Sequence, residues 1–180
     1  MWQVTTYPST KALTVEDAKL HLNILDDSFD TIIGDYIDAA QMMLYKEANI
    51  LAAPMTFTRY YQGWDDFSFD YDPFTSVVVT YFDSDNVEQT LAATDYKLFD
   101  GCFPVVINPI EMPSLFDRVN PIKLVAVGGY TTAPANVKQC LRMIVADLFE
   151  NRQTDQTGSV SVLSRNTDYQ ISLITRRGAI

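Results

Sequence analysis

The chain has 180 residues, with 13 basic and 23 acidic side chains, a formal net charge of −10 and a hydrophobic fraction of 47%. That length allows one domain with a sizeable core, or a core with one appended lobe. The excess of acid argues against a nucleic-acid clamp and against docking on anionic lipid, because both need clustered Lys and Arg. No apolar run approaches the ~18 residues that cross a bilayer, and the N-terminus lacks the basic start and apolar run of a secretory signal. We therefore expect a protein made and used in a reducing cytoplasm.

The two cysteines, Cys102 and Cys140, agree with that compartment. Two thiols are too few for a disulfide framework, and these two do not form a CxxC pair. We expect both to be inert apolar fillers, since a free cysteine behaves as a small hydrophobe.

Residues 1–11 are typical of an irregular or extended arm. A short helix is predicted over residues 14–23, with Thr14 as its N-cap and Asp17, three residues on, approximating a capping box. Acidic side chains in this first turn also favour the positive end of the helix dipole.

A second, longer helix is predicted over residues 28–49, and Asp26-Asp27-Ser28 offers its N-cap. Pro54 then closes the helical region. The apolar residues of this stretch recur at the 3.6-residue period of an amphipathic helix: Phe29, Ile32, Ile33, Tyr36, Ile37, Ala40, Met43, Leu44 and Ala48.

The middle of the chain is rich in Val, Thr, Phe and Tyr, which favour strands. Strands are predicted over residues 55–61, 75–82, 87–91, 96–99, 105–107 and 123–127. Asp83-Ser84-Asp85-Asn86 is typical of a turn, because Asp and Asn tolerate the left-handed conformation and bond their own backbone.

Gly128-Gly129 ends the last strand, and helical periodicity returns over residues 135–153, preceded by Pro134. Residues 154–180 show no strong period and suggest an extended tail, with strand-like segments at 160–163 and 169–174 that need a partner. The order of elements therefore predicts an α+β fold: a small helical bundle with an inserted antiparallel β lobe and an extended C-terminal tail.

No catalytic, cofactor-binding or metal-binding residue is predicted. The single histidine, His21, has Asp17 one turn before it, but no nucleophile can be assigned to the pair, so we expect a surface histidine. One His and two distant Cys do not make a zinc site. The segment beginning at Asp83 starts like a calcium loop and then fails at Val87 and Glu88.

The most unusual stretch is residues 64–74, where aromatic and acidic side chains alternate. One interpretation is a hairpin or loop whose aromatic face packs on its own core. The other is an exposed surface that docks a partner, since aromatic residues anchor interfaces. The candidate partner-interface residues are Trp64, Phe67, Phe69 and Tyr71, together with Arg176 and Arg177, which either pair with a neighbour's carboxylates or form a solvated end.

Three stretches together resemble the head–tail connector, or adaptor, proteins of long-tailed bacteriophages. The first, LTVEDAKLHLNI with DDSFDTIIGDYIDAA, spans residues 13–40. The second, PFTSVVVTYFDSDNVEQTLAATDYKLF, spans residues 73–99 and looks like the family's strand and Tyr-x-Asp turn. The third, KLVAVGGYTTAPANVKQCLRMIVADLFENRQ, spans residues 123–153 and is similar to its final strand and helix.

The resemblance implies a connector domain over residues 1–153, with helices at about 14–23, 28–49 and 135–153 around a β lobe at 55–127, followed by a tail or arm over 154–180. It implies a ring of identical subunits, usually twelve, in the virion neck. The ring lies between the portal protein and a downstream neck or tail-completion protein, and DNA passes through it.

An acidic channel wall repels DNA at short range, so we expect some carboxylates to face the lumen. The candidates are Asp26, Asp27, Asp65, Asp66, Asp70 and Asp72. We expect assembly in the host cytoplasm, no cofactor, no membrane contact and no catalysis. The alternative is an acidic inhibitor that mimics DNA and blocks a nucleic-acid enzyme; such a protein is a monomer or dimer, whereas a ring subunit assembles on its portal.

Overall fold

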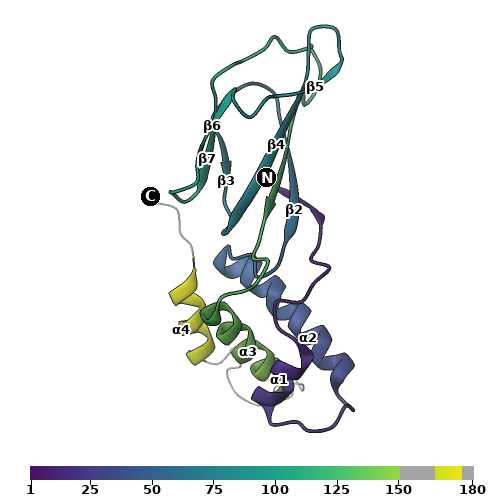
Figure 1. Ribbon diagram of the computed structural model, residues 1–180, viewed down its shortest axis with the longest axis vertical. Helices are drawn as coiled ribbons and strands as arrows, with labels where there is room; N and C mark the ends of the chain where they lie inside the picture. The colour runs from purple at the N-terminus through teal and green to yellow at the C-terminus, as the bar shows by residue number, and fades with distance from the viewer. Residues whose placement is uncertain (151–164, 176–180) are drawn as a thin grey trace, which may run out of the picture. The chain divides into compact units, whose positions relative to one another are not determined.

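A computed structural model describes residues 1–150 and 165–175 (Figure 1). In these residues the chain divides into two compact units. The β unit comprises residues 1–8 and 54–129, and the helical unit comprises residues 9–53, 130–150 and 165–175. The β unit is thus inserted between the second and third helices, and the predicted α+β class is confirmed.

The β unit contains a five-stranded antiparallel sheet, ordered β1-β2-β8-β4-β5, and a three-stranded antiparallel sheet, ordered β3-β7-β6. Figure 1 shows β3, β6 and β7 in one layer and β2 and β4 in the other. The strands are β1 (Gln3–Thr6), β2 (Met55–Tyr61), β3 (Phe67–Phe69), β4 (Phe74–Phe82), β5 (Glu88–Thr90), β6 (Tyr96–Phe99), β7 (Val105–Pro109) and β8 (Ile122–Gly128).

The inner faces of the two sheets form the core of the β unit. In the large sheet, β8 pairs with β2 so that Phe57 lies opposite Ala126, and with β4 so that Val79 lies opposite Leu124. Facing residues of an antiparallel pair point to the same side, and all four of these side chains are buried. Phe67, Phe69 and Ile107 bury the inner face of the small sheet.

All six strands predicted from the sequence are present, with ends shifted by at most two residues. The predicted turn at residues 83–86 is confirmed, and Asn86 has a φ of 60° in it. Two further strands, β1 and β3, pair with predicted ones. The N-terminal arm therefore is tied to the sheet edge, because β1 bonds β2 and the Trp2 Nε1–H donates to the Ser68 carbonyl at 2.9 Å.

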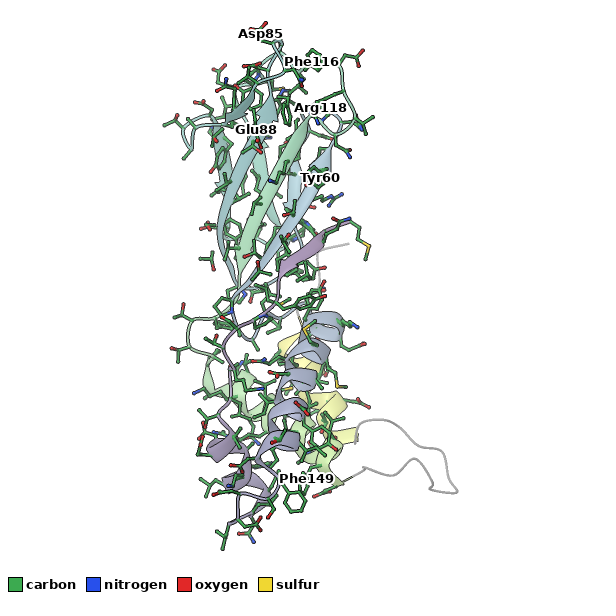
Figure 2. The ribbon with its side chains drawn as sticks, turned by 90° about the vertical axis from the view of Figure 1, so that its right-hand side faces the viewer. Tyr60, Asp85, Glu88, Phe116, Arg118 and Phe149 are labelled. Atoms are coloured by element: carbon green, nitrogen blue, oxygen red, sulfur yellow. The ribbon has the colours of Figure 1, made fainter. Side chains whose placement is uncertain are left out.

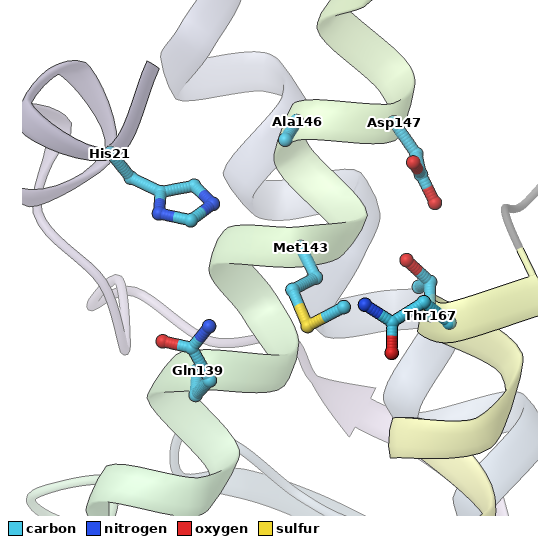
Figure 3. Close-up of a pocket in the computed structure, with 7 residues that line it drawn as sticks. His21, Gln139, Met143, Ala146, Asp147 and Thr167 are labelled. Carbon is cyan, nitrogen blue, oxygen red and sulfur yellow. The ribbon is translucent and has the colours of Figure 1, made fainter. Parts of the chain in front are cut away.

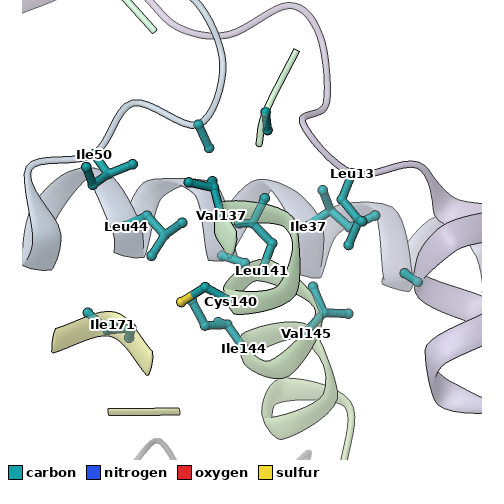
Figure 4. Close-up of a cluster of buried hydrophobic side chains, with 14 of the residues drawn as sticks. Leu13, Ile37, Leu44, Ile50, Val137, Cys140, Leu141, Ile144, Val145 and Ile171 are labelled. Atoms are coloured by element: carbon teal, nitrogen blue, oxygen red, sulfur yellow. The ribbon is translucent and has the colours of Figure 1, made fainter. Parts of the chain in front are cut away.

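The helical unit consists of α1 (Val15–Leu22), α2 (Asp30–Met43), a π-helical turn η1 (Leu44–Ala48), α3 (Ala135–Glu150) and α4 (Arg165–Ile174). Their apolar faces meet in one buried cluster (Figure 4). Ile37 and Leu44 enter it from α2 and η1, Leu141 and Ile144 from α3, and Ile171 from α4. None of the helices in the described residues is both long and apolar enough to cross a membrane.

The cap predicted for the first helix is confirmed, because the Asp17 N–H donates to the Thr14 hydroxyl at 3.0 Å. The cap predicted at residues 26–28 is wrong. The second helix begins at Asp30, and its N-cap residue Phe29 makes no side-chain cap hydrogen bond. The Phe29 ring instead packs edge-on against Phe149, with centroids 5.6 Å apart, which fixes the start of α2 through apolar contact.

The extended tail predicted for residues 154–180 is wrong for residues 165–174, which form α4. In particular, residues 169–174 are helical, because a helix lets Thr167 and Ile171, four residues apart, bury on one face. The other predicted strand, 160–163, lies outside the described residues.

Candidate interaction surfaces

The aromatic–acidic segment, residues 64–74, packs its aromatic side chains on the core of the β unit. Phe67 and Phe69 are 0% exposed, so the prediction that they form a partner-docking surface is wrong. The ring of Tyr71 stacks on Phe57, with centroids 4.9 Å apart and planes 15° apart. The segment is hydrophobic on one side because β3 must bury that side against the large sheet.

Trp64 is half-buried at one end of this segment. Its Nε1–H donates to the Pro113 carbonyl at 2.8 Å, and its ring lies 5.4 Å from that of Tyr81. The indole therefore already has apolar and polar contacts inside the β unit. Arg176 and Arg177, the remaining candidate interface residues, lie outside the described residues.

The acidic side chains of the same segment point away from this core or lie at its rim. Asp65 and Asp66 are exposed, and Asp66 accepts a hydrogen bond from the Asn108 amide. Asp70 and Asp72 are half-buried. The alternation in the sequence thus separates an aromatic inner side from an acidic outer side.

The other acidic candidates, Asp26 and Asp27, lie in the loop between α1 and α2. Lys19 Nζ lies 2.5 Å from Asp27 and 2.8 Å from Asp30, and these bonds raise the pKa of the lysine. Hydrogen bonds from the side chain and backbone of Ser28 hold the pKa of Asp26 below its usual range. Asp27 is therefore partly neutralised by its own unit.

The hairpin between β4 and β5 is organised by one carboxylate. Asp83 Oδ1 accepts the backbone N–H groups of Asp85 and Val87, each at 3.0 Å, and Oδ2 accepts the Gln89 amide at 2.9 Å. These donors lower the pKa of Asp83. The guanidinium of Arg118 covers the ring of Phe82 nearby, with Cζ 3.8 Å from its centroid.

The outer face of the five-stranded sheet is a surface that the sequence analysis missed (Figure 2). Tyr60, labelled on it, is 47% exposed, and Val78 is 48% exposed. The signal was present in the sequence, because Val77-Val78-Val79 places an apolar residue on both sides of β4 where a solvent-facing sheet ordinarily alternates apolar with polar.

His21 lies in a groove of about 330 Å³ in the helical unit (Figure 3). Gln139, Met143 and Asp147 of α3 line this groove, with Thr167 of α4 on its far side. Among residues 1–150 and 165–175, His21 makes no hydrogen bond or ion pair, so no carboxylate orients its imidazole. Asp17, the predicted neighbour, instead lies 3.9 Å from Arg142.

The two cysteines differ in setting. Cys140 is buried in the helical cluster, which raises the pKa of its thiol to about 11, so the expectation of an apolar filler holds there. It is wrong for Cys102, which is exposed in the turn between β6 and β7. The part of the chain that the structure describes contains no cluster of three His, Cys, Asp or Glu residues able to hold a metal ion.

Comparison with known proteins gives matches to solved structures alone. No protein-family model and no curated protein matches the sequence. The fold is similar to a chain in the neck of an empty GTA particle computed with C6 symmetry, with a TM-score of 0.78. It is also similar to chains in the virion of a native gene transfer agent particle (TM-score 0.77) and in the neck of a native GTA particle computed with C12 symmetry (0.75).

Each of these matches covers 100% of this chain and 97% of the other, at 17% sequence identity. The whole fold, including both units, is therefore shared over nearly the full length of each neighbour. The shared fold agrees with the resemblance to head–tail connectors found in the sequence motifs.

Proposed function

We propose that this chain is a structural subunit of the neck of a tailed, phage-like particle. The observation that carries the proposal is the fold, which matches chains in structures of particle necks from end to end. The connector-like motifs at residues 13–40, 73–99 and 123–153 support it independently, because they are a property of the amino-acid sequence alone.

The subunit forms a ring of twelve identical copies between the portal protein and a downstream neck or tail-completion protein, and DNA passes through the ring. Neck structures computed with C6 and C12 symmetry support repeated copies around an axis. A ring of one chain needs a heterologous contact, in which two different faces of each subunit meet.

The net charge of −10 suits the wall of a DNA channel, because carboxylates repel phosphates and do not hold the DNA in transit. Asp65 and Asp66 are exposed and available for this role, and Asp26 is too. We propose these residues, with Asp27, Asp70 and Asp72, as lumen-facing groups.

The C-terminal residues are proposed to contact a neighbouring protein through Arg176 and Arg177, since arginine pairs readily with carboxylates. Truncating the chain after Gln153 also removes α4, so a chain ending at Thr175 isolates the arginines. Loss of portal docking by the shorter deletion supports the contact, and unchanged docking contradicts it.

Electron cryomicroscopy of particles from a strain lacking this gene tests the main proposal. We expect heads that package DNA but carry no tails, with normal particles restored by the intact gene. Image classes of restored necks should show a twelvefold ring at the portal. Tailed, infectious particles in the absence of the chain would overturn the proposal, and a purified monomer that blocks a nucleic-acid enzyme would favour the DNA-mimic alternative.

A further inference from the structure

Two loops meet at one end of the β unit, where β4 ends and β8 begins (Figure 2). They are the β4–β5 hairpin, residues 82–88, and the β7–β8 loop, residues 110–121. Five large apolar side chains in these loops are between 38% and 76% exposed: Val87, Ile110, Met112, Phe116 and Val119. We call this surface the apolar tip.

The two loops hold each other in place. The Phe116 N–H donates to the Phe82 carbonyl at 3.0 Å, and the Phe82 N–H donates to the Pro121 carbonyl at 2.9 Å. Arg118, the single basic residue of the two loops, donates to the Asn86 side chain at 3.3 Å, and its guanidinium covers the Phe82 ring. The exposed apolar side chains therefore stand on a preorganised backbone, which reduces the entropy lost when a partner binds.

Acidic side chains surround these apolar groups. Asp83 is engaged in the hairpin turn by backbone N–H groups. The other four acids of the loops are exposed, and none of them forms an ion pair with any described residue: Asp85, Glu88, Glu111 and Asp117. An exposed apolar surface rimmed by polar groups is typical of a protein-binding site. Carboxylates on that rim favour a partner that bears Lys and Arg.

A second copy of this chain does not supply such a partner surface. The net charge of the chain is −10, and two acidic tips repel each other. The lysines without an ion pair in the described residues lie in four different elements, so no helix or strand of a copy offers more than one of them: Lys46, Lys97, Lys123 and Lys138. The apolar tip therefore suits a different protein.

We propose that the apolar tip binds the downstream neck or tail-completion protein, on a surface where Lys and Arg surround an apolar pocket. This inference rests on the proposed function, in which the ring has a neighbour on each side. The portal is the neighbour proposed for Arg176 and Arg177, and that contact needs carboxylates on the portal. The apolar tip needs cations on its partner, and so it fits the other neighbour.

Two double variants of the full-length chain test the apolar and the charged part of the tip separately. Val87→Ser with Val119→Ser removes apolar surface, and Asp85→Lys with Asp117→Lys reverses charge. Each variant gene is returned to the strain that lacks the native gene. Electron micrographs then count heads that carry the ring on the portal and heads that are joined to tails. We expect rings as in the native particle, and tails joined about tenfold less often for each double variant.

The matched controls change exposed positions of the helical unit and should join tails normally. They are Leu20→Ser with Leu25→Ser, and Asp35→Lys with Glu47→Lys. Circular dichroism of the purified chains establishes that each variant is folded. Asp85→Asn with Asp117→Asn keeps the size of both side chains and removes their charge, and it should reduce tail joining less than the lysine pair does.

Normal tail joining by either the serine pair or the lysine pair at the tip would overturn the inference and leave the proposed function intact. Loss of the ring from the portal together with the tails would also overturn it, because the tip would then serve the portal or a second copy. A native gene that restores neither rings nor tails would overturn both the inference and the proposed function.

Discussion

The helical unit and the β unit differ in whether their cationic side chains form ion pairs. In the helical unit, Lys11 pairs with Asp38, Lys19 with Asp27 and Asp30, and Arg142 with Asp17. None of the cations of the β unit pairs with a carboxylate within the described residues. The guanidinium groups of Arg59 and Arg118 lie over aromatic rings. The other two cations, Lys97 and Lys123, form no ion pair with any described residue.

The exposed apolar side chains show the same asymmetry. Among the described residues, 15 large apolar side chains are exposed; 11 lie in the β unit and four in the helical unit. The four in the helical unit are Leu20, Leu25, Tyr169 and Leu173. Charges without partners and apolar groups in water are both typical of a surface used for association. Within the described residues, the ion pairs therefore lie in the helical unit, whereas most of the exposed apolar side chains lie in the β unit.

The largest loss of stability is expected when a buried side chain in the core of either unit is shortened to alanine. Leu141→Ala in the helical unit and Ile107→Ala in the β unit each remove a fully buried side chain, and each should lower the free energy of unfolding by about 2–5 kcal/mol. Urea denaturation measures this. Leu20→Ala and Val78→Ala are the exposed controls and should cost about 0.5 kcal/mol or less. A large cost at Val78 would contradict its exposed position on the outer face of the five-stranded sheet.

A smaller effect is expected at the start of α1. Thr14→Ala removes the acceptor of the Asp17 N–H and should cost about 0.5–2 kcal/mol, because an N-terminal helix donor then loses its partner. Thermal unfolding followed by circular dichroism measures the loss. Thr10→Ala, at an exposed position nearby, is the control. Equal stability of the two variants would show that the cap contributes nothing to the helical unit.

Each unit contains one cysteine, and the two thiols should differ in reactivity because one is exposed and the other is buried. Cys102 should react with a maleimide within minutes at pH 7, because it is exposed, and Cys140 should react after the helical unit opens. Burial raises the pKa of Cys140 to about 11 in the folded state from an ordinary value of 9.0. Its neutral form therefore favours folding, and this contribution is lost as pH rises from about 9 through 11. Mass spectrometry of Cys102→Ser and Cys140→Ser variants assigns each modification; prompt labelling of Cys140 would contradict its burial.

The elements that the sequence predicted well are those in which local pattern and tertiary packing agree. The 3.6-residue period of α2 and α3 coincides with the buried cluster, and the Val- and Thr-rich strands coincide with the large sheet. The π-helical turn at Leu44–Ala48 was not predicted, because its one-residue-longer bond, from the Asn49 N–H to the Leu44 carbonyl, leaves the apolar spacing nearly unchanged.

The predictions that were wrong concern elements whose conformation is determined by contacts with residues far away in the chain. Tyr169-Gln170-Ile171-Ser172 alternates like a strand, yet α4 forms because Ile171 is buried in the helical cluster against α3. Likewise, the alternation of aromatic and acidic residues in 64–74 showed that one side of the segment is apolar. It did not show whether that side packs on a partner or on the core of the same chain. The position of Phe57 on another strand decides that question, and no local pattern contains it.

The smallest effect is expected at the β4–β5 hairpin of the β unit, where the partly buried carboxylate of Asp83 organises the turn. The pKa of Asp83 should lie below its ordinary value of 3.8, because the N–H groups of Val87 and Asp85 and the Gln89 amide stabilise the ionised form. The contribution of Asp83 to stability is thus present above pH 3.8 and lost as pH falls through the folded pKa. An NMR titration of the side-chain carboxyl gives the midpoint. Asp83→Ala should speed hydrogen exchange of the Val87 amide, whereas Asp85→Ala, its exposed neighbour, should leave that amide unchanged. A midpoint above 3.8, or equal exchange in the two variants, would show that the turn is held by backbone conformation alone.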